Sequence, residues 1–182
     1  MTTQTPSSGH VFWLYGLSGA GKSTLAGLFR AELCARGVPV LALDGDTVRS
    51  GLCAGLGFSD EARTENLRRS SEVARLARDS GLWVVASFIT PLESHRDLIT
   101  RIIGAEALSL VYLDAPINTC QSRDVKGLYA RAREGRLAQM TGISSRFEVP
   151  GQTDITLDTG ACSPEACVAR LLSYAADKLG SH

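Results

Sequence analysis

Residues 16–23 are the clearest candidates for chemistry in this sequence. They read Gly-Leu-Ser-Gly-Ala-Gly-Lys-Ser and match the pattern G-x-x-x-x-G-K-[S/T] at every fixed position. In such a loop, small residues let consecutive backbone N–H groups point at phosphate oxygens, at the positive end of the following helix. Lys22 would reach the β- and γ-phosphates, and the Ser23 hydroxyl can bind Mg²⁺. We expect a nucleoside triphosphate to contact Gly16, Leu17, Ser18, Gly19, Ala20, Gly21, Lys22, Ser23 and Thr24.

A second group of charged residues follows the next apolar run of the chain. Residues 44–49 read Asp-Gly-Asp-Thr-Val-Arg and supply two carboxylates and a guanidinium. In phosphoryl transfer a carboxylate orients the acceptor hydroxyl and takes its proton, while cations neutralise the moving group. Asp46 fits the first role, and Lys22 with Mg²⁺ and arginines fits the second. Two alternatives stay open, because Asp-Gly-Asp can be a turn with a helix cap and Asp114 can serve as the metal-side aspartate.

Strand and helix patterns alternate around these two groups. Such alternation predicts a parallel sheet with helices on both faces, and near-continuous apolar runs are typical of strands buried on both sides. Ligands bind beyond the carboxyl ends of the strands in sheets of this kind, where both charged groups lie. The expected strands are 11–15, 38–43, 82–88, 108–113 and 155–157, and the expected helices are 24–36, 61–79, 93–103, 118–122 and 164–179.

The segment 124–150 breaks this alternation. It is rich in arginine and glycine and has no clear core face. In a phosphotransferase such a segment is expected to be a lid, because closure over the nucleotide excludes water. A mobile surface excursion is the alternative.

Length and composition indicate an ordinary globular protein. The chain has 182 residues, 44% hydrophobic and 21% charged, which suits one α/β domain, expected at residues 10–182. Nineteen basic and nineteen acidic residues give a formal net charge of zero, so we expect neither nucleic acid nor an anionic membrane as a partner. Residues 1–9 are polar and are expected to be flexible, without the apolar stretch of a signal peptide or anchor.

Cysteine and lysine usage adds two further expectations. Five scattered cysteines without a C-x-x-C pair indicate a reducing cytoplasm and no structural zinc site. Only three lysines occur, at positions 22, 126 and 178, so Lys126 is an unusual choice of positive charge within the expected lid. The same positions leave no place for the N-K-x-D motif of a switch-type GTPase.

Several blocks of this sequence closely resemble the adenylylsulfate (APS) kinases, a family of P-loop kinases. The resemblance runs in register from about residue 10 to the last helix. It implies a P-loop NTPase-type three-layer fold with a five-stranded parallel sheet in the order 2-3-1-4-5. It also implies transfer of the γ-phosphate of MgATP to the 3′-hydroxyl of adenosine 5′-phosphosulfate (APS), in sulfate assimilation. The blocks are Leu43–Arg49, Leu56–Asp60, Arg63–Arg69 with its Glu-Asn-Leu-Arg-Arg end, Ser87–Pro91, Arg123–Tyr129 and Thr141–Ile143.

The resemblance also implies roles for individual residues. Asp46, Lys22 and Thr90 are the implied catalytic residues, although direct in-line transfer needs no covalent intermediate on Thr90. Phe58 would stack on the adenine of the acceptor, and Arg49, Arg63 and Asn66 would hold its phosphosulfate. The full implied acceptor set is Asp44, Asp46, Arg49, Phe58, Arg63, Asn66, Ile89, Thr90, Lys126 and Met140, and Ser23 is the implied metal ligand.

Four positions depart from the family pattern. Thr47 stands for the usual asparagine, Ser50 for a histidine or aromatic residue, and Thr90 for a serine. Met140 replaces a phenylalanine that forms the second face of an aromatic sandwich around the adenine, and methionine packs more loosely against a ring. A kinase for another nucleotide-like acceptor and a non-catalytic ATP-binding domain that regulates a sulfurylase therefore remain alternatives. The resemblance further suggests a homodimer, and it leaves association with an ATP sulfurylase open.

Overall fold

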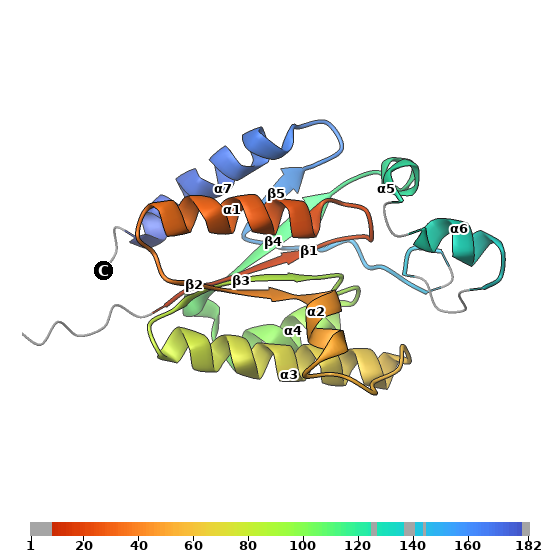
Figure 1. Ribbon diagram of the computed structural model, residues 1–182, viewed down its shortest axis with the longest axis horizontal. Helices are drawn as coiled ribbons and strands as arrows, with labels where there is room; N and C mark the ends of the chain where they lie inside the picture. Colours follow the sequence, from red (N-terminus) through yellow and green to blue (C-terminus); the bar gives the residue numbers. More distant parts are fainter. Residues whose placement is uncertain (1–8, 125–126, 137–140, 144, 180–182) are drawn as a thin grey trace, which may run out of the picture.

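The centre of the protein is a five-stranded parallel sheet (Figure 1). The computed structural model describes residues 9–124, 127–136, 141–143 and 145–179. The strands lie in the order β2-β3-β1-β4-β5, which confirms the predicted order. Tyr15 pairs with Phe88 and Tyr112, and Asp44 pairs with Ser87, so the carboxyl ends of the strands are aligned at one edge. The strands are Val11–Tyr15 (β1), Val40–Asp44 (β2), Trp83–Phe88 (β3), Leu108–Asp114 (β4) and Ile155–Asp158 (β5).

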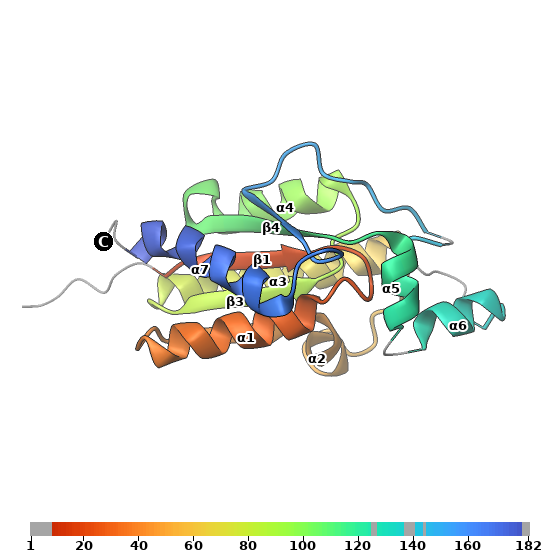
Figure 2. The same ribbon diagram turned by 90° about the horizontal axis from the view of Figure 1, so that it is seen from above.

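Long helices cover both faces of this sheet. Helices α1 (Lys22–Ala35) and α7 (Pro164–Leu179) lie on one face, and α3 (Asp60–Asp79) and α4 (Glu93–Ile103) lie on the other (Figures 1 and 2). The side chains of β1 alternate between the two resulting cores, with Phe12 in the first and Trp13 in the second. All five residues of β1 are buried, which explains why its sequence is an unbroken apolar run.

Three short helices lie beyond the carboxyl ends of the strands. They are α2 (Gly45–Ser50), α5 (Ile117–Arg123) and α6 (Leu128–Arg133), and a single 3₁₀ turn, η1 (Ala105–Ala107), precedes β4. Figures 1 and 2 place α5 and α6 together at the end of the molecule to which the strands point. No helix in the part of the chain that the structure describes is long and apolar enough to cross a membrane.

Two of these short helices were not expected from the sequence. Residues 45–50 and 128–133 each make less than two turns, so neither shows a helical repeat of apolar residues. Local capping starts both of them. The Asp44 carboxylate accepts from the backbone N–H of Asp46 at 3.0 Å, and the Asp124 carboxylate accepts from the N–H groups of Tyr129 and Ala130 at 3.1 and 3.0 Å. The alternative that Asp-Gly-Asp forms a helix cap is therefore correct, and it does not exclude a role of these residues in the site.

The first described residue, Gly9, is already packed against the rest of the domain. Gly9 is buried, and its N–H donates to the carbonyl oxygen of Arg78 at 3.2 Å. A Cβ at this position would lie 1.9 Å from the carbonyl oxygen of Leu82, so only glycine fits there. Gly9, which directly precedes the expected domain boundary at residue 10, is therefore closely packed.

Candidate active site

A cavity of about 700 Å³ lies beyond the carboxyl ends of the strands. Its volume is within the range of small-molecule sites, and its lining is continuous from the loop after β1 to α2 and α3. The cavity therefore joins the two charged groups that the sequence singled out. It is lined by residues 18–25, Asp44–Asp46, Arg49, Phe58, Arg63, Asn66, Leu67, residues 87–91, Arg123, Asp124, Leu128, Thr159, Cys162, Pro164 and Cys167.

The loop at residues 16–23 depends on glycine for its shape. Gly16, Gly19 and Gly21 have φ values of +147°, +82° and +91°, which favour glycine. A Cβ on Gly16 would lie 2.6 Å from the Leu113 carbonyl oxygen, and one on Gly19 would lie 2.6 Å from that of Cys120. The loop is thus fitted closely against β4 and α5 and can take no larger residue at these positions.

Lys22 lies over this loop. Its Nζ donates to the carbonyl oxygens of Gly16 and Leu17 at 3.0 and 2.6 Å. The ammonium group therefore stays within the curve of the loop, close to where the phosphates of a nucleotide would lie. Gly16 and Leu17 do not themselves line the cavity, so they contribute to the shape of the loop and to the position of Lys22.

Ser23, Asp44 and Ser87 form a small cluster of oxygen atoms next to the loop. Asp44 Oδ2 accepts from Ser23 Oγ at 2.7 Å and from Ser87 Oγ at 2.9 Å. Burial opposes ionisation of Asp44, but these hydrogen bonds and those from the backbone of residues 46 and 47 lower its pKa below the usual value. The carboxylate is consequently charged at neutral pH.

This cluster has the chemistry of a magnesium site completed by substrate. Hydroxyl and carboxylate oxygens are the ligands that Mg²⁺ prefers, and it is commonly bound by one or two carboxylates together with phosphates. Among the described residues, no group of three or more His, Cys, Asp or Glu side chains could hold a metal by itself. Ser23 and Asp44 therefore fit Mg²⁺ that arrives with a nucleotide. Asp114, which the sequence left open as the metal-side aspartate, is not among the cavity-lining residues. Its carboxylate accepts from the Tyr112 hydroxyl at 3.4 Å.

Two arginines and an aromatic ring form the opposite side of the cavity. The Arg49 guanidinium carbon lies 4.6 Å from the centre of the Phe58 ring, and that of Arg63 lies 6.0 Å from it. Arg63 is 9% exposed, and its Nε donates to the Phe58 carbonyl oxygen at 2.9 Å. Burial lowers the pKa of Arg63, and the charge of Arg49 lowers it further. Both guanidinium groups stay protonated, so two positive charges repel each other at this side of the cavity. An anion bound there would relieve that repulsion.

Asn66 adds a buried polar group to the same side. The residue is 3% exposed and lines the cavity, and its Nδ2 has no hydrogen-bond partner among the described residues. A buried amide without a partner costs stability, and a ligand oxygen in the cavity would remove that cost. The unpartnered amide of Asn66 therefore indicates ligand binding, and it does so independently of the motif at residues 16–23.

Thr90 is the one residue other than glycine that has a positive φ, at +46°, in the described part of the chain. Its hydroxyl accepts from the indole Nε1 of buried Trp13 at 2.9 Å, and its carbonyl oxygen accepts from Arg96 at 3.4 Å. Strained backbone of this kind is concentrated at functional sites. The neighbouring Ile89 carbonyl accepts from the Gly16 N–H at 3.3 Å and joins this loop to the phosphate loop. The catalytic role of Thr90 remains a prediction, and its hydroxyl has a structural partner.

The segment expected to be a lid contacts both sides of the cavity. The Tyr129 hydroxyl, in α6, donates to the Ser18 carbonyl oxygen at 2.9 Å, and burial raises the pKa of Tyr129 to about 12. Arg63 Nη1 donates to Thr141 Oγ1 at 3.0 Å. A Cβ on Gly142 would lie 2.8 Å from the Leu17 side chain. Tyr129 and Gly142 thus contact the phosphate loop, and Thr141 contacts Arg63.

Four further predicted residues do not form part of the described cavity lining. Lys126 and Met140 are not among the described residues, so their predicted roles stay predictions. Thr47 and Ser50 are exposed and do not line the cavity, and Ser50 Oγ donates to the Thr47 carbonyl oxygen at 2.9 Å. Of the four departures from the family pattern, Thr90 is therefore the only described one that lines the cavity.

Another part of the lining was not expected from the sequence. Arg123 Nη2 donates to the Thr159 carbonyl oxygen at 2.7 Å, and Thr159 Oγ1 donates to the Ala20 carbonyl oxygen at 2.9 Å. These contacts, with Cys162 and Pro164, form the wall behind the phosphate loop. Thr159 directly follows β5, so extending the rule on strand ends to the fifth strand would have found it.

Comparisons with known proteins point to one family. The family model described as adenylylsulphate kinase matches residues 8–158. A protein of Shewanella amazonensis named adenylyl-sulfate kinase is 47% identical over 166 residues, which cover 91% of this chain and 84% of that protein.

Solved structures give the same result. The APS kinase CysC of Mycobacterium tuberculosis, in complex with AMPPNP and APS, has a TM-score of 0.88 and 40% identity over 92% of this chain and 98% of its own. A hexameric APS kinase from Thiobacillus denitrificans has a TM-score of 0.71 and 26% identity, and the match covers 97% of this chain and 30% of that one.

Proposed function

The chain belongs to the adenylylsulfate kinase family, and we propose that it transfers the γ-phosphate of MgATP to the 3′-hydroxyl of APS. The products are 3′-phosphoadenosine 5′-phosphosulfate and ADP, as sulfate assimilation requires. One observation carries the proposal: a single cavity joins the phosphate loop to Arg49, Phe58, Arg63 and Asn66. Such a cavity holds donor and acceptor side by side, and positioning of this kind supplies much of the rate in phosphoryl transfer.

The donor half of the cavity would bind ATP. Residues 18–24 supply backbone N–H groups and the Lys22 ammonium for the phosphates, at the start of α1. The wall at Arg123, Thr159 and Pro164 would border the adenine end of the same nucleotide. Ser23 and Asp44 would hold Mg²⁺, which when bound neutralises charge on the phosphates.

The acceptor half would bind APS. The phosphosulfate is a small, doubly charged anion, which suits the two adjacent guanidinium groups of Arg49 and Arg63. Phe58 is 54% exposed and presents a ring on which an adenine can stack. Asn66 Nδ2 would donate to an oxygen of the acceptor, and Ile89 with Thr90 would close one side.

Asp46 would orient the 3′-hydroxyl and take its proton. It lies in the first turn of α2 and lines the same cavity as Lys22 and Arg49. A carboxylate there can accept a hydrogen bond from the acceptor hydroxyl, while Lys22 faces the group being transferred. Thr90 would position the acceptor without a covalent intermediate. Lys126 and Met140 would complete the site from the segment 124–150, which we propose is the lid of a kinase domain at residues 10–182.

Assembly and location belong to the same proposal. All five cysteines are free thiols, which supports a reducing compartment, and we propose the cytoplasm. The family resemblance supports a homodimer, which sedimentation of the purified protein would test. Association with an ATP sulfurylase would be tested by co-purification of the two proteins.

A coupled assay of ADP release tests the proposed reaction. The purified protein with ATP and Mg²⁺ should turn over APS, and adenosine 5′-monophosphate should be a much poorer acceptor because it lacks the sulfate. Turnover confined to another nucleotide would favour a kinase of different acceptor specificity, and absence of turnover on every acceptor would favour a regulatory ATP-binding domain.

A further inference from the structure

The residues 51–59, which we call the platform loop, carry Phe58. The loop contains three glycines, and Gly55 has a φ of +87°, which favours glycine. Cys53 is 1% exposed and anchors the middle of the loop in the core. Phe58, at the far end, is 54% exposed and lacks such an anchor. An exposed ring can act as a stacking surface only if its backbone is held in place.

Three arginine side chains hold this backbone by donating to its carbonyl oxygens. Arg49 Nη1 donates to Gly57 at 3.0 Å, Arg63 Nε to Phe58 at 2.9 Å and Arg69 Nη1 to Leu52 at 3.3 Å. Arg49 and Arg63 also line the cavity, where they would contact the acceptor directly. Arg69 does not line it. Its contact with the platform loop is therefore the one that can act only through the position of the loop.

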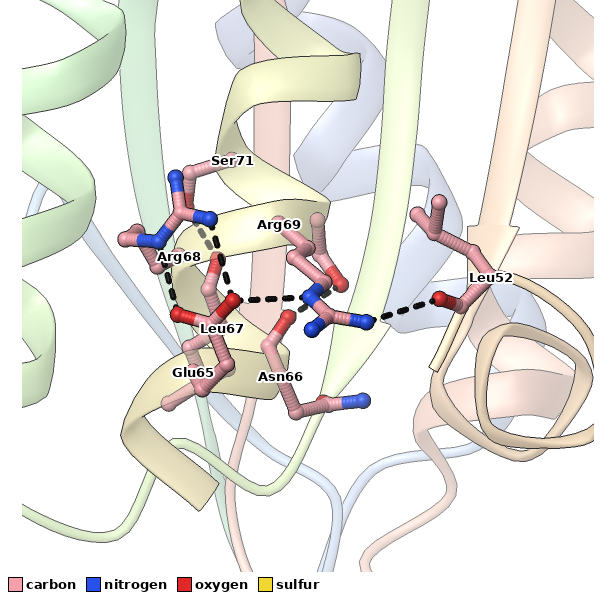
Figure 3. A network of polar contacts seen from close by, with 8 residues as sticks. Leu52, Glu65, Asn66, Leu67, Arg68, Arg69 and Ser71 are labelled. Atoms are coloured by element: carbon pink, nitrogen blue, oxygen red, sulfur yellow. Dashed lines mark hydrogen bonds and ion pairs between the residues drawn. The ribbon is translucent and has the colours of Figure 1, made fainter. Parts of the chain in front are cut away.

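Glu65 fixes the orientation of Arg69 (Figure 3). Glu65 Oε1 accepts from Arg69 Nε at 2.7 Å, and this ion pair points the far end of the guanidinium at the Leu52 carbonyl oxygen. Glu65 also pairs with Arg68, through Nε at 2.7 Å and Nη2 at 3.0 Å. The two arginines thus share one carboxylate, and of the two, Arg69 continues to the platform loop.

We propose that Glu65 and Arg69 are positioning residues for the acceptor: together they hold the platform loop so that Phe58 lies ready to stack on the adenine of the substrate. The inference rests on the proposed function, because it assigns Phe58 to the acceptor. It predicts that disturbing a contact outside the cavity changes recognition of the acceptor and leaves recognition of ATP unchanged. Neither residue lines the cavity, so neither is assigned a catalytic role.

Glu65, Arg68 and Arg69 keep their charges at neutral and mildly acidic pH. Hydrogen bonds from Arg68 and Arg69 lower the pKa of Glu65 to about 2, so the carboxylate remains ionised at neutral and mildly acidic pH. The positioning effect should consequently be constant across that range. Because the side chains of Glu65 and Arg69 are 33% and 37% exposed, the ion pair itself is weak, and its value lies in orientation.

The test compares Arg69→Met with Arg68→Met. Both variants remove one arginine from Glu65, but only the first removes the bond to Leu52. For Arg69→Met we expect the KM for APS to rise about three- to tenfold, with kcat and the KM for ATP within about twofold of the unmodified protein. Arg68→Met should change all three constants by less than about twofold. Glu65→Gln, which keeps the shape of the side chain, should raise the KM for APS by a smaller factor than Arg69→Met.

A double-mutant cycle with Phe58→Ala separates positioning from general damage. If Arg69 acts through Phe58, then Arg69→Met should change the KM for APS by less than about twofold once Phe58 is alanine. An additive effect in that background would overturn the proposal, as would equal KM values for Arg69→Met and Arg68→Met. If Arg69→Met does not fold, Glu65→Gln takes its place in the cycle with the same expected result. No turnover of APS by the unmodified protein would overturn the proposed function together with this inference, whereas the other two results overturn the inference alone.

Discussion

The donor half and the acceptor half of the cavity are built in different ways. The donor half is centred on one continuous loop, residues 16–23, whose shape follows from its own glycines and from the start of α1. The acceptor half collects side chains from α2, from the platform loop, from α3 and from the end of β3. A local sequence can specify the first, whereas the second exists only when the whole sheet has formed. Substitutions should therefore act locally in the donor half and through several segments in the acceptor half.

The largest effect is expected at Lys22. Replacing it with methionine removes the cation that we propose faces the transferred phosphoryl group, so kcat should fall by about 10²–10³-fold. Lys178→Met is the matched control, because Lys178 Nζ lies 5.6 Å from the Tyr174 ring, on α7. Steady-state kinetics with saturating APS would measure both. A kcat for Lys22→Met equal to that of the control would break the assignment of the donor half.

Asp46→Asn should have the next largest effect. The amide keeps the size of the side chain but cannot take the hydroxyl proton, so kcat should fall by about 10²-fold. The KM for ATP should stay unchanged, because Asp46 acts on the acceptor hydroxyl and not on ATP. Asp114→Asn is the control, and it also tests the alternative metal-side aspartate. An intact kcat in Asp46→Asn would remove this residue from its proposed role.

Arg63→Met tests how the acceptor half is held together. Arg63 both faces the cavity and donates to the Phe58 carbonyl and to Thr141, so one substitution removes several charged hydrogen bonds. We expect the KM for APS to rise about tenfold or more, which is larger than for Arg69→Met. The KM for ATP should change little. A parallel rise in both KM values would contradict the separation of the two halves.

The smallest effect is a dependence of stability on pH that arises behind the acceptor half. His95 on α4 is 2% exposed, and its Nε2 lies 3.2 Å from Thr64 Oγ1 on α3. Burial lowers the pKa of His95. The nearby positive charges of Arg63 and Arg96 lower it as well, and the negative charges of Asp60 and Glu148 only partly oppose this. The folded protein therefore binds the proton less readily than the unfolded chain does. Stability that is complete above the unfolded pKa of about 6.5 should decrease as the pH falls below it.

Thermal unfolding at pH 7.5 and pH 5.5 would measure this dependence. His95→Gln keeps a hydrogen-bonding group near Thr64 but does not titrate, so the decrease in Tm should be smaller for the variant than for the unmodified protein. An equal decrease in both would show that the dependence arises elsewhere.

The same contrast explains what the sequence could predict. The phosphate loop and the five strands were predicted correctly, because a complete motif and long apolar runs carry local information. The sheet order, which the structure confirms, was implied by the family resemblance. Helices α2 and α6 were not, since capping by Asp44 and Asp124 starts them without an apolar repeat. The positive φ of Thr90 and the wall at Arg123 and Thr159 depend on contacts between distant segments. The acceptor residues were proposed through the family resemblance, and their convergence on one cavity needed the structure.

Transfer of phosphate between ATP and APS within one cavity can be tested by phosphorus NMR of the products that the purified protein forms from the two nucleotides. We expect one new 3′-phosphomonoester of the adenosine phosphosulfate for each ADP formed. ADP accompanied by inorganic phosphate, with APS unchanged, would rule out this transfer.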